Sequence, residues 1–487
     1  MPILPGELIP SRIIKLQIMQ RKLALAIALI SSLWWNRAAG QEHHTTEQVY
    51  GTWQEADTVQ IRSVQDLFVK GEVEGHVRNY FMATLNHGSL SDNYANAIGA
   101  EIGYKTASLH GFRFGFAGLF TYNLFSSDIW ERDFISEKHP KLELELFDIE
   151  DPHNKADLDR LDELYLEYNS ARVRAKVGRF SFNSPLMNPQ DTRMKPYSFQ
   201  GIKVQVPLQQ NGLITLAWFD HFSPRSTVSW LKADKSIGVF SPGVDEYGNP
   251  SGYAHHTQTR GVAVAGLQLH PNKRLNAEAW NYWIENVSNN SYGKAVVEVA
   301  PHVKAGIEGL YQFQVGNGGN PESTRVYFPN QKQWLAGGML AYEPKNLHLS
   351  LNYLQIDGDG RFLFPREWGR EQFFATLSRG RMEGAGKSAL LAAKARKQWS
   401  GNFSSELALA KTWLPAPHDY RYNKYGAVSY WGWVADLNYS PSKPVLDGLS
   451  FRLLYIGRAS PEMDIPLRDM YYNTNFHNIN FVTQLTF

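Results

Sequence analysis

The chain contains no cysteine among its 487 residues. Disulfide frameworks, zinc–thiolate centres and cysteine nucleophiles are therefore excluded. The motifs H-E-x-x-H and G-x-S-x-G are also missing, and the stretch 380–391, which resembles a phosphate-binding loop, has Arg381 where that loop needs glycine. We therefore predict a protein that is not an enzyme and that holds no cofactor and no metal.

A strong excess of either charge is missing as well. The chain has 49 Lys and Arg against 47 Asp and Glu, and residues 1–40 hold five of the basic and one of the acidic residues. Without that stretch the count is 44 basic against 46 acidic residues, a net charge of −2. A balance this close to neutral gives no reason to expect a nucleic-acid partner.

The N-terminal region has the layout of a secretory signal. Two basic residues precede an apolar stretch that is short for a membrane span, and small residues follow it. We predict a signal peptide over residues 1–40, cleaved near Ala39 or Gly40, with Met19 as an alternative start. An N-terminal anchor helix is the competing interpretation.

Beyond residue 40 the chain has no apolar run long enough for a transmembrane helix. Residues 41–70 are polar, and we expect them to form a periplasmic N-terminal segment. From residue 71 to 487 apolar and polar residues alternate, as in "VKAGIEGLYQFQV" (303–315), which is the period of a strand with two different faces. About 18 such segments begin near residues 72, 94, 110, 161, 171, 198, 212, 256, 274, 291, 303, 333, 346, 387, 401, 427, 446 and 474.

Short and long connections largely alternate between these segments, and aromatic residues such as Trp399, Trp413 and Tyr439 stand near their ends. This pattern is typical of an all-β, up-and-down transmembrane antiparallel β-barrel in the outer membrane of a Gram-negative bacterium. A soluble propeller or sandwich is the alternative, but the repeat of about 40 to 50 residues that propeller blades would give is missing. We expect outer-membrane lipid as a partner, and the barrel assembly machinery through the C-terminal Phe487, with a monomer and a homotrimer both open.

The stretch "ARVRAKVGRF" (171–180) alternates cations with small apolar residues. In a spanning strand the apolar face meets lipid, because an outward charge is costly there, and the cations line a wet lumen. The same parity in other strands predicts a basic ladder that attracts carboxylates. Pairing with lumen carboxylates such as Glu74 and Glu308 is the alternative. The predicted ladder is Arg172, Arg174, Lys176, Lys203, Lys394 and Arg396.

The stretch "VGRFSFNSPLMNPQDTRMKPYSFQGIKVQV" (177–206) resembles the third-loop region of the OprD family of outer-membrane porins. The resemblance lies in Val177-Gly178, in Arg193, and in Pro196 ahead of a strand that contains Gly201. "PREWGREQFFATLSRGRMEGAG" (365–386) and "EGHVRNYFM" (74–82) are similar to a long loop and to the first strand of that family.

The resemblance implies a channel narrowed by inward-folded loops, with Asp191, Arg193 and Tyr197 in a constriction loop. It also implies passage of basic amino acids, small carboxylates or short oligosaccharides. We therefore expect a porin for passive, selective diffusion of small hydrophilic solutes that carry a carboxylate: amino acids, peptides or organic acids. A porin for short oligosaccharides is the alternative, and an outer-membrane barrel enzyme is a further one.

The segment 131–163 contains 12 acidic and 5 basic residues. At the mouth of a channel it could hold the cationic group of a zwitterionic solute. The alternative is a loop whose acidic side chains are simply solvated.

Overall fold

The computed structural model describes residues 61, 63–190, 192–208, 211–462 and 464–487. The predicted signal peptide, Met19 and most of the segment 41–70 lie outside the described residues. In the described part of that segment the short helix α2 (Val64–Val69) begins after Ser63, whose side chain accepts a hydrogen bond from the Asp66 amide. Among the described helices, none combines the length and the apolar character that crossing a bilayer requires.

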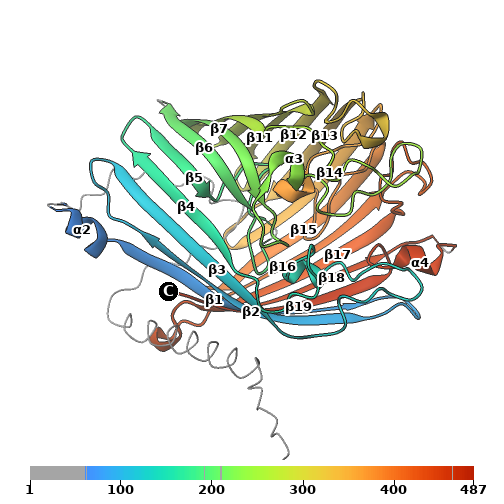
Figure 1. Ribbon diagram of the computed structural model, residues 1–487, viewed down its shortest axis with the longest axis horizontal. Helices are drawn as coiled ribbons and strands as arrows, with labels where there is room; N and C mark the ends of the chain where they lie inside the picture. Colours follow the sequence, from blue (N-terminus) through green and yellow to red (C-terminus); the bar gives the residue numbers. More distant parts are fainter. Residues whose placement is uncertain (1–60, 62, 191, 209–210, 463) are drawn as a thin grey trace, which may run out of the picture. The chain divides into compact units, whose positions relative to one another are not determined.

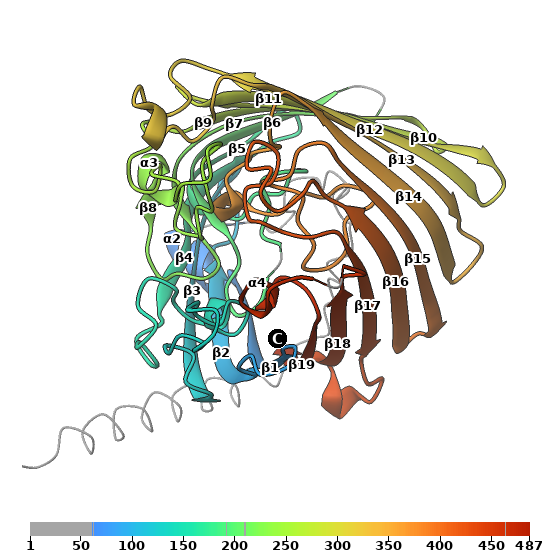
Figure 2. The same ribbon diagram turned by 90° about the vertical axis from the view of Figure 1, so that its right-hand side faces the viewer.

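The strands form one closed antiparallel ring, as Figures 1 and 2 show. Each strand pairs with its neighbours in sequence, and β1 (Glu72–Leu85) also pairs with β19 (Phe476–Thr486), which closes the ring. Of the 19 strands in the sheet, β8 (Leu231–Lys232) is a two-residue addition to β7 (Gly212–Ser223) within a loop. The predicted up-and-down barrel of 18 strands is confirmed.

The remaining elements follow the same order along the chain. The strands are β2 (Asn93–Lys105), β3 (Phe112–Ser126), β4 (Arg160–Asn169), β5 (Arg174–Phe180), β6 (Ser198–Leu208), β9 (Val262–Asn272), β10 (Leu275–Ile284), β11 (Ser288–Ala300), β12 (Val303–Gln314), β13 (Lys332–Tyr342), β14 (Leu347–Gly358), β15 (Ser388–Ser400), β16 (Phe403–Trp413), β17 (Tyr430–Tyr439) and β18 (Leu449–Ala459). The helices are η1 (Leu144–Leu146), α3 (Ala233–Ser236), η2 (Ser323–Arg325), η3 (Arg366–Trp368), η4 (Pro444–Leu446) and α4 (Leu467–Met470).

Every predicted strand start lies within six residues of an observed one. The largest difference is at β9, which was expected near residue 256 and begins at Val262. Residues 256–261 instead end the preceding loop, and Gly261 adopts φ +152°, where an added Cβ would lie 2.2 Å from the Phe219 carbonyl oxygen. Alternation of polar and apolar residues thus located the wall, and tertiary contacts set the exact ends.

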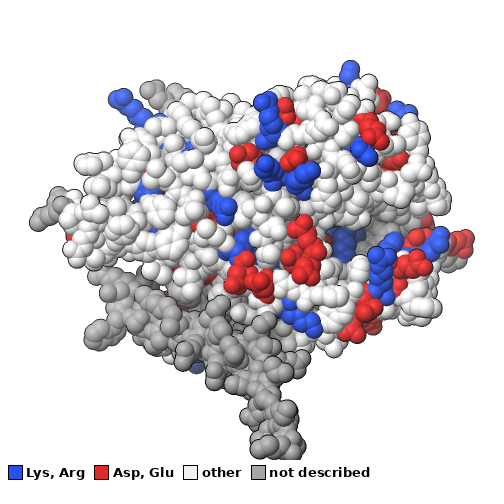
Figure 3. Space-filling view, in the orientation of Figure 1, with Lys and Arg blue, Asp and Glu red and all other residues white. Residues whose placement is uncertain are grey.

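The two faces of the wall differ as a membrane requires. On β16, Leu407, Leu409 and Trp413 are exposed on the outside, while Ala408 and Ala410 between them are buried. Long loops connect the strands at one rim and mostly short turns connect them at the other, so the long-loop rim is the extracellular one. On the face drawn in Figure 3, most charged side chains gather toward the end with α4 and the long loops.

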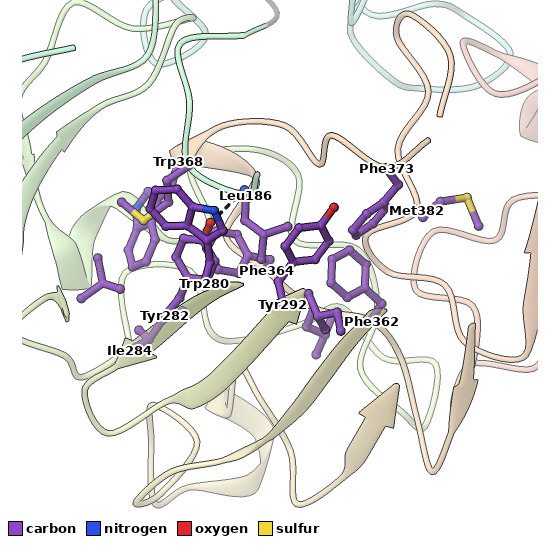
Figure 4. Packing of buried hydrophobic residues seen from close by; sticks show 14 of the residues in the cluster. Leu186, Trp280, Tyr282, Ile284, Tyr292, Phe362, Phe364, Trp368, Phe373 and Met382 are labelled. Carbon is purple, nitrogen blue, oxygen red and sulfur yellow. Dashed lines mark hydrogen bonds between the residues drawn. The ribbon is translucent and has the colours of Figure 1, made fainter. Parts of the chain in front are cut away.

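Loops fold into the ring and pack against its inner wall (Figures 2 and 4). Leu186 in the β5–β6 loop (181–197) lies in the same buried cluster as Tyr282 of β10, and its amide donates to the Tyr282 hydroxyl at 3.3 Å. Trp368 in the β14–β15 loop (359–387) stacks on Phe222 with ring centres 4.2 Å apart. This apolar core fixes both loops inside the barrel.

Candidate functional site: a cationic constriction where four loops meet

A buried carboxylate joins three of the inward-folded loops. Glu145 of the β3–β4 loop (127–159) pairs with Arg193 at 2.8 Å and with Arg225 of the β7–β9 loop (224–261) at 2.7 Å. Burial alone would raise the pKa of Glu145, but the two guanidinium groups outweigh it and hold that pKa well below its usual range. The carboxylate is therefore charged and serves as the central anchor of the loops.

The predicted constriction residues belong to this anchor. The Tyr197 hydroxyl accepts from Arg225 Nε at 3.0 Å and from Arg381 of the β14–β15 loop, also at 3.0 Å. Tyr197 is 0% and Arg193 2% exposed, so neither side chain is open to a solute. They hold the constriction loop in place instead. Asp191 lies outside the described residues.

At the centre of the acidic segment 131–163, the carboxylates are buried by packing against the rest of the barrel interior. Glu143, Glu145 and Asp148 are buried. Glu143 accepts from the Thr84 hydroxyl of β1 at 2.5 Å and from the Tyr472 hydroxyl of the β18–β19 loop (460–475). Neither expectation for this segment describes these carboxylates: they are not solvated, and they are not open to a solute.

Cations that keep contact with lumen space surround this anchor, and we call them the constriction cluster. Lys141 is exposed at the start of the buried part of its loop, and the others are partly exposed. Arg458 of β18 donates to the Arg379 carbonyl oxygen at 3.0 Å and lies over the Tyr430 ring at 4.6 Å. The cluster consists of Lys141, Arg366, Arg379, Arg381 and Arg458.

Lys141 is the member least fixed by the protein. Within the described part of the chain its amino group has no hydrogen bond and no ion pair. Loss of hydration among the surrounding loops and repulsion from Arg366, Arg458 and Arg381 lower the pKa of Lys141 to about 7, against the opposing attraction of Glu145. A lysine in this setting gains most from an anion that enters the lumen.

Protein carboxylates only partly balance the cluster. Glu371 lies 3.8 Å from Arg381. Glu383 lies 3.9 Å from Arg366, but its closer partner is Lys424 at 2.9 Å, so it is shared between two cations. An excess of positive charge therefore remains where the loops meet.

The wall supplies a second basic region, on β5 and β6. Lys176 pairs with Glu167 of β4 at 3.0 Å, and Arg174 lies 3.9 Å from the same carboxylate. Lys203 stands opposite Lys176 in the strand register and has no ion pair among the residues that the structure describes. The ladder stays a prediction here, and the alternative of pairing with a carboxylate describes two of its three cations, Arg174 and Lys176.

Arg172 does not extend this region. The structure begins β5 at Arg174, and residues 170–173 form the turn before it. The Ser170 hydroxyl accepts from the amides of Arg172 at 3.4 Å and Val173 at 3.1 Å, which closes the turn. Arg172 is exposed at the short-turn rim, so its expected place on the strand, together with the places of Ala171 and Val173, is corrected.

The two predicted cations of β15 have different surroundings. Lys394 donates to the carbonyl oxygens of Phe374 at 2.7 Å and Thr376 at 2.9 Å, and so ties the β14–β15 loop to the wall. Arg396 is exposed and stands opposite Glu406 in the register. Over the described ranges, no group of three or more His, Asp or Glu side chains converges to hold a metal ion.

Sequence reasoning missed the constriction cluster, although signals for part of it were present. Arg366, Arg379 and Arg381 stand in the stretch 365–386 that carries the OprD resemblance. Arg458 has the inward parity of Arg452 on the same strand. Lys141, in contrast, is hidden within an acidic run, and no sequence pattern singles it out.

Comparison with known proteins points to one family of channels. Residues 165–389, which run from β4 to β15 and include the β5–β6 and β14–β15 loops, match the model described as "outer membrane porin, OprD family". The match covers 225 of the 487 residues, and over this stretch the chain is similar to the OprD family. A search of curated protein sequences found no match.

Solved OprD-type channels share the fold of this porin over most of its length. OccK8 (OprE) of Pseudomonas aeruginosa is 13% identical, with a TM-score of 0.66, covering 86% of this chain and 99% of that one. P. aeruginosa OpdK, solved with vanillate, is 15% identical, with a TM-score of 0.64 and coverage of 86% and 99%. OccAB4 of Acinetobacter baumannii is 14% identical, with a TM-score of 0.64 and coverage of 86% and 98%.

The match to the OprD family model and the closed β-barrel together place the chain in the Gram-negative outer membrane as a porin for small solutes. OprD-family porins are channels and not enzymes, which agrees with the lack of catalytic motifs in the sequence.

Proposed function

We propose that this OprD-family porin passes small hydrophilic solutes that carry a carboxylate, such as amino acids, peptides or organic acids, by passive diffusion. The observation that carries the proposal is the excess of lumen-facing cations at the meeting point of the loops. A solute would meet the constriction cluster first and then the inward cations of β5, β6 and β15.

The chemistry of the cluster suits brief capture of a carboxylate. Guanidinium groups present planar pairs of N–H donors that match the two oxygens of a carboxylate. Arg379 is held by the Tyr80 hydroxyl at 3.0 Å and by Asn480 at 2.8 Å, so this donor is oriented before the solute arrives. Because the cluster keeps contact with water, binding stays weak enough for release, as conduction requires.

A structural neighbour supports the same class of solute. OpdK was solved with vanillate, an aromatic carboxylate. The oligosaccharide alternative has less support, because a sugar path needs exposed aromatic faces and the inward rings of Phe182, Phe199 and Phe219 are buried in the loop core.

Planar-bilayer recording of the purified porin tests the proposal. We expect reversal potentials in a salt gradient to show anion preference, and succinate to block more strongly than a chitooligosaccharide. The double variant Lys141→Gln, Arg458→Gln should lose most of that preference, whereas Arg468→Gln, at an exposed position on α4, should keep it. Cation preference in the unmodified porin, or equal block by both solutes, would refute the proposal.

A further inference from the structure

A lysine lies on the lipid-facing side of the barrel wall. Lys411 of β16 stands between Leu409 and Trp413, which are both exposed on the outer face. In the register it stands opposite Leu391 of β15 and Trp431 of β17, which are exposed on the same face. The period of a strand therefore directs Lys411 outward, away from the lumen.

No protein anion compensates this lysine. Lys411 is only 9% exposed, and its amino group lies 5.4 Å from the centre of the Trp431 ring. It has no hydrogen bond and no ion pair to any residue of the described ranges. Its stem is thus packed among apolar side chains, while its charge needs an anion from the membrane.

The depth of Lys411 identifies the leaflet. It stands two residues before the end of β16 at Trp413, on the rim that carries the long loops. That rim faces the outside of the cell. The amino group therefore lies at the level of the headgroups of the outer leaflet.

A groove in the outer wall lies beside this position and crosses the strands from β18 to β13. It has a volume of about 820 Å³, and Leu409 and Trp433 line its end nearest Lys411, while Tyr342 and Leu349 line the other. Ala393 and Ala435 contribute small side chains between those ends. The groove is apolar and elongated across the strands, as an acyl chain requires.

Aromatic side chains that carry polar atoms lie beside the groove on the same face. The Trp433 ring lies over Gly457, where an added Cβ would come within 2.2 Å of the ring. On the far side His477 stacks on Tyr455, and its Nδ1 lies 2.8 Å from the Tyr455 hydroxyl. Aromatic rings with polar edges of this kind suit the boundary between acyl chains and a sugar headgroup.

We propose that this outer face binds lipid A, the phosphorylated and acylated disaccharide of the outer leaflet. A phosphate of lipid A accepts from the Lys411 amino group, and one acyl chain lies in the groove. The charge complementarity at Lys411 selects the phosphate, and the position at the extracellular rim selects a lipid of that leaflet.

Native mass spectrometry of the full chain in detergent tests the proposal with bisphosphorylated lipid A, dephosphorylated lipid A and phosphatidylglycerol as probes. We expect Lys411→Gln to bind bisphosphorylated lipid A about fivefold more weakly than the unmodified porin, and Lys411→Arg to retain binding. Lys397→Gln is the matched control, because Lys397 lies over Trp399 at 4.1 Å on the outer face of β15 near the short-turn rim. It should leave binding unchanged.

The groove is tested by Ala393→Trp, which fills it without changing charge and should weaken both forms of lipid A. Unchanged binding in Lys411→Gln, equal binding of dephosphorylated lipid A, or equal binding of phosphatidylglycerol would overturn the proposal. If Lys411→Gln fails to fold, the comparison of the two lipid A forms on the unmodified porin decides it. A homo-oligomer that forms without lipid and is lost in Ala393→Trp would assign the groove to a second copy and would also overturn it.

Discussion

The basic region on the barrel wall and the constriction cluster are both lined with cations, but their charges are balanced differently. On the wall, Glu167 lies directly opposite Lys176 in the register and also faces Arg174. In the cluster, Glu383 is divided between Arg366 and Lys424, and Lys141 has no ion pair in the part of the chain that the structure describes. A strand fixes its neighbours by register, so wall charges find partners. Loops bring together cations whose partners are already engaged.

The largest effect should come from removing the anchor of the loops. In Glu145→Gln the buried guanidinium groups of Arg193 and Arg225 lose their shared counterion, which costs on the order of 3–5 kcal/mol for a buried pair. The expected result is a lower free energy of unfolding in urea and larger, noisier single-channel currents. Glu131→Gln, at an exposed position of the same loop, should change the unfolding free energy by less than about 0.5 kcal/mol.

The pH dependence of stability follows from the same carboxylate. Because the folded-state pKa of Glu145 lies below its usual value of about 4.3, its contribution is present above that value and is lost as the pH falls further toward the folded-state pKa. We expect urea unfolding of the unmodified porin to ease below about pH 4. A Glu145→Gln porin with the same acid sensitivity would contradict the assignment.

The next effect concerns the cluster itself. Lys141→Gln should lower the ratio of anion to cation permeability several-fold at pH 6, on the order expected for one charge in a confined, partly desolvated path. Because the folded porin lowers the pKa of Lys141, the charged lysine destabilises the fold at pH 6, so Lys141→Gln should raise the unfolding free energy. Reversal potentials and urea unfolding measured on the same preparation separate the two results.

A smaller effect should appear when pH is raised across the Lys141 titration. Its pKa is lowered to about 7, so the amino group is charged at pH 6 and neutral at pH 8. Anion preference should therefore fall between these values in the unmodified porin. The same pH change should have little effect in Lys141→Gln, and an equal fall in that variant would assign the titration to another group.

The smallest effects are expected on the wall and have opposite signs. Lys176→Gln removes a cation that Glu167 already neutralises at 3.0 Å, so anion preference should change little. Glu167→Gln releases Lys176 and Arg174 from that carboxylate and should increase anion preference. The free energy of an anion inside the channel should fall by less than about 1 kcal/mol. A decrease in Glu167→Gln would show that this carboxylate lies outside the solute path.

The wall of the barrel could be predicted from the sequence, whereas the packing of the loops could not. Period-two alternation depends only on neighbouring residues, so it located the strands and the inward parity of Lys203 and Arg396. The burial of Arg193 and Tyr197 could not be read in this way. It depends on Glu145 and Arg225, which lie 48 and 32 positions away from Arg193 and reach it only when three loops fold inward.

The surroundings of Lys411 can be predicted from the sequence only in part. Its parity with Leu409 and Trp413 is visible in the sequence, and it marks the lysine as a member of the outer face. Its depth near the extracellular rim, the ring of Trp431 beside it and the groove that begins at Leu409 and Trp433 require the register of three strands.

The two hydroxyl donors to Glu143 come from opposite ends of the chain, Thr84 on the first strand and Tyr472 in the last loop. Since β1 and β19 become neighbours only when the ring closes, Glu143 acquires both donors only at that moment. We therefore expect the β3–β4 loop to reach its final position in the lumen only after the ring has closed, late in the assembly of the barrel.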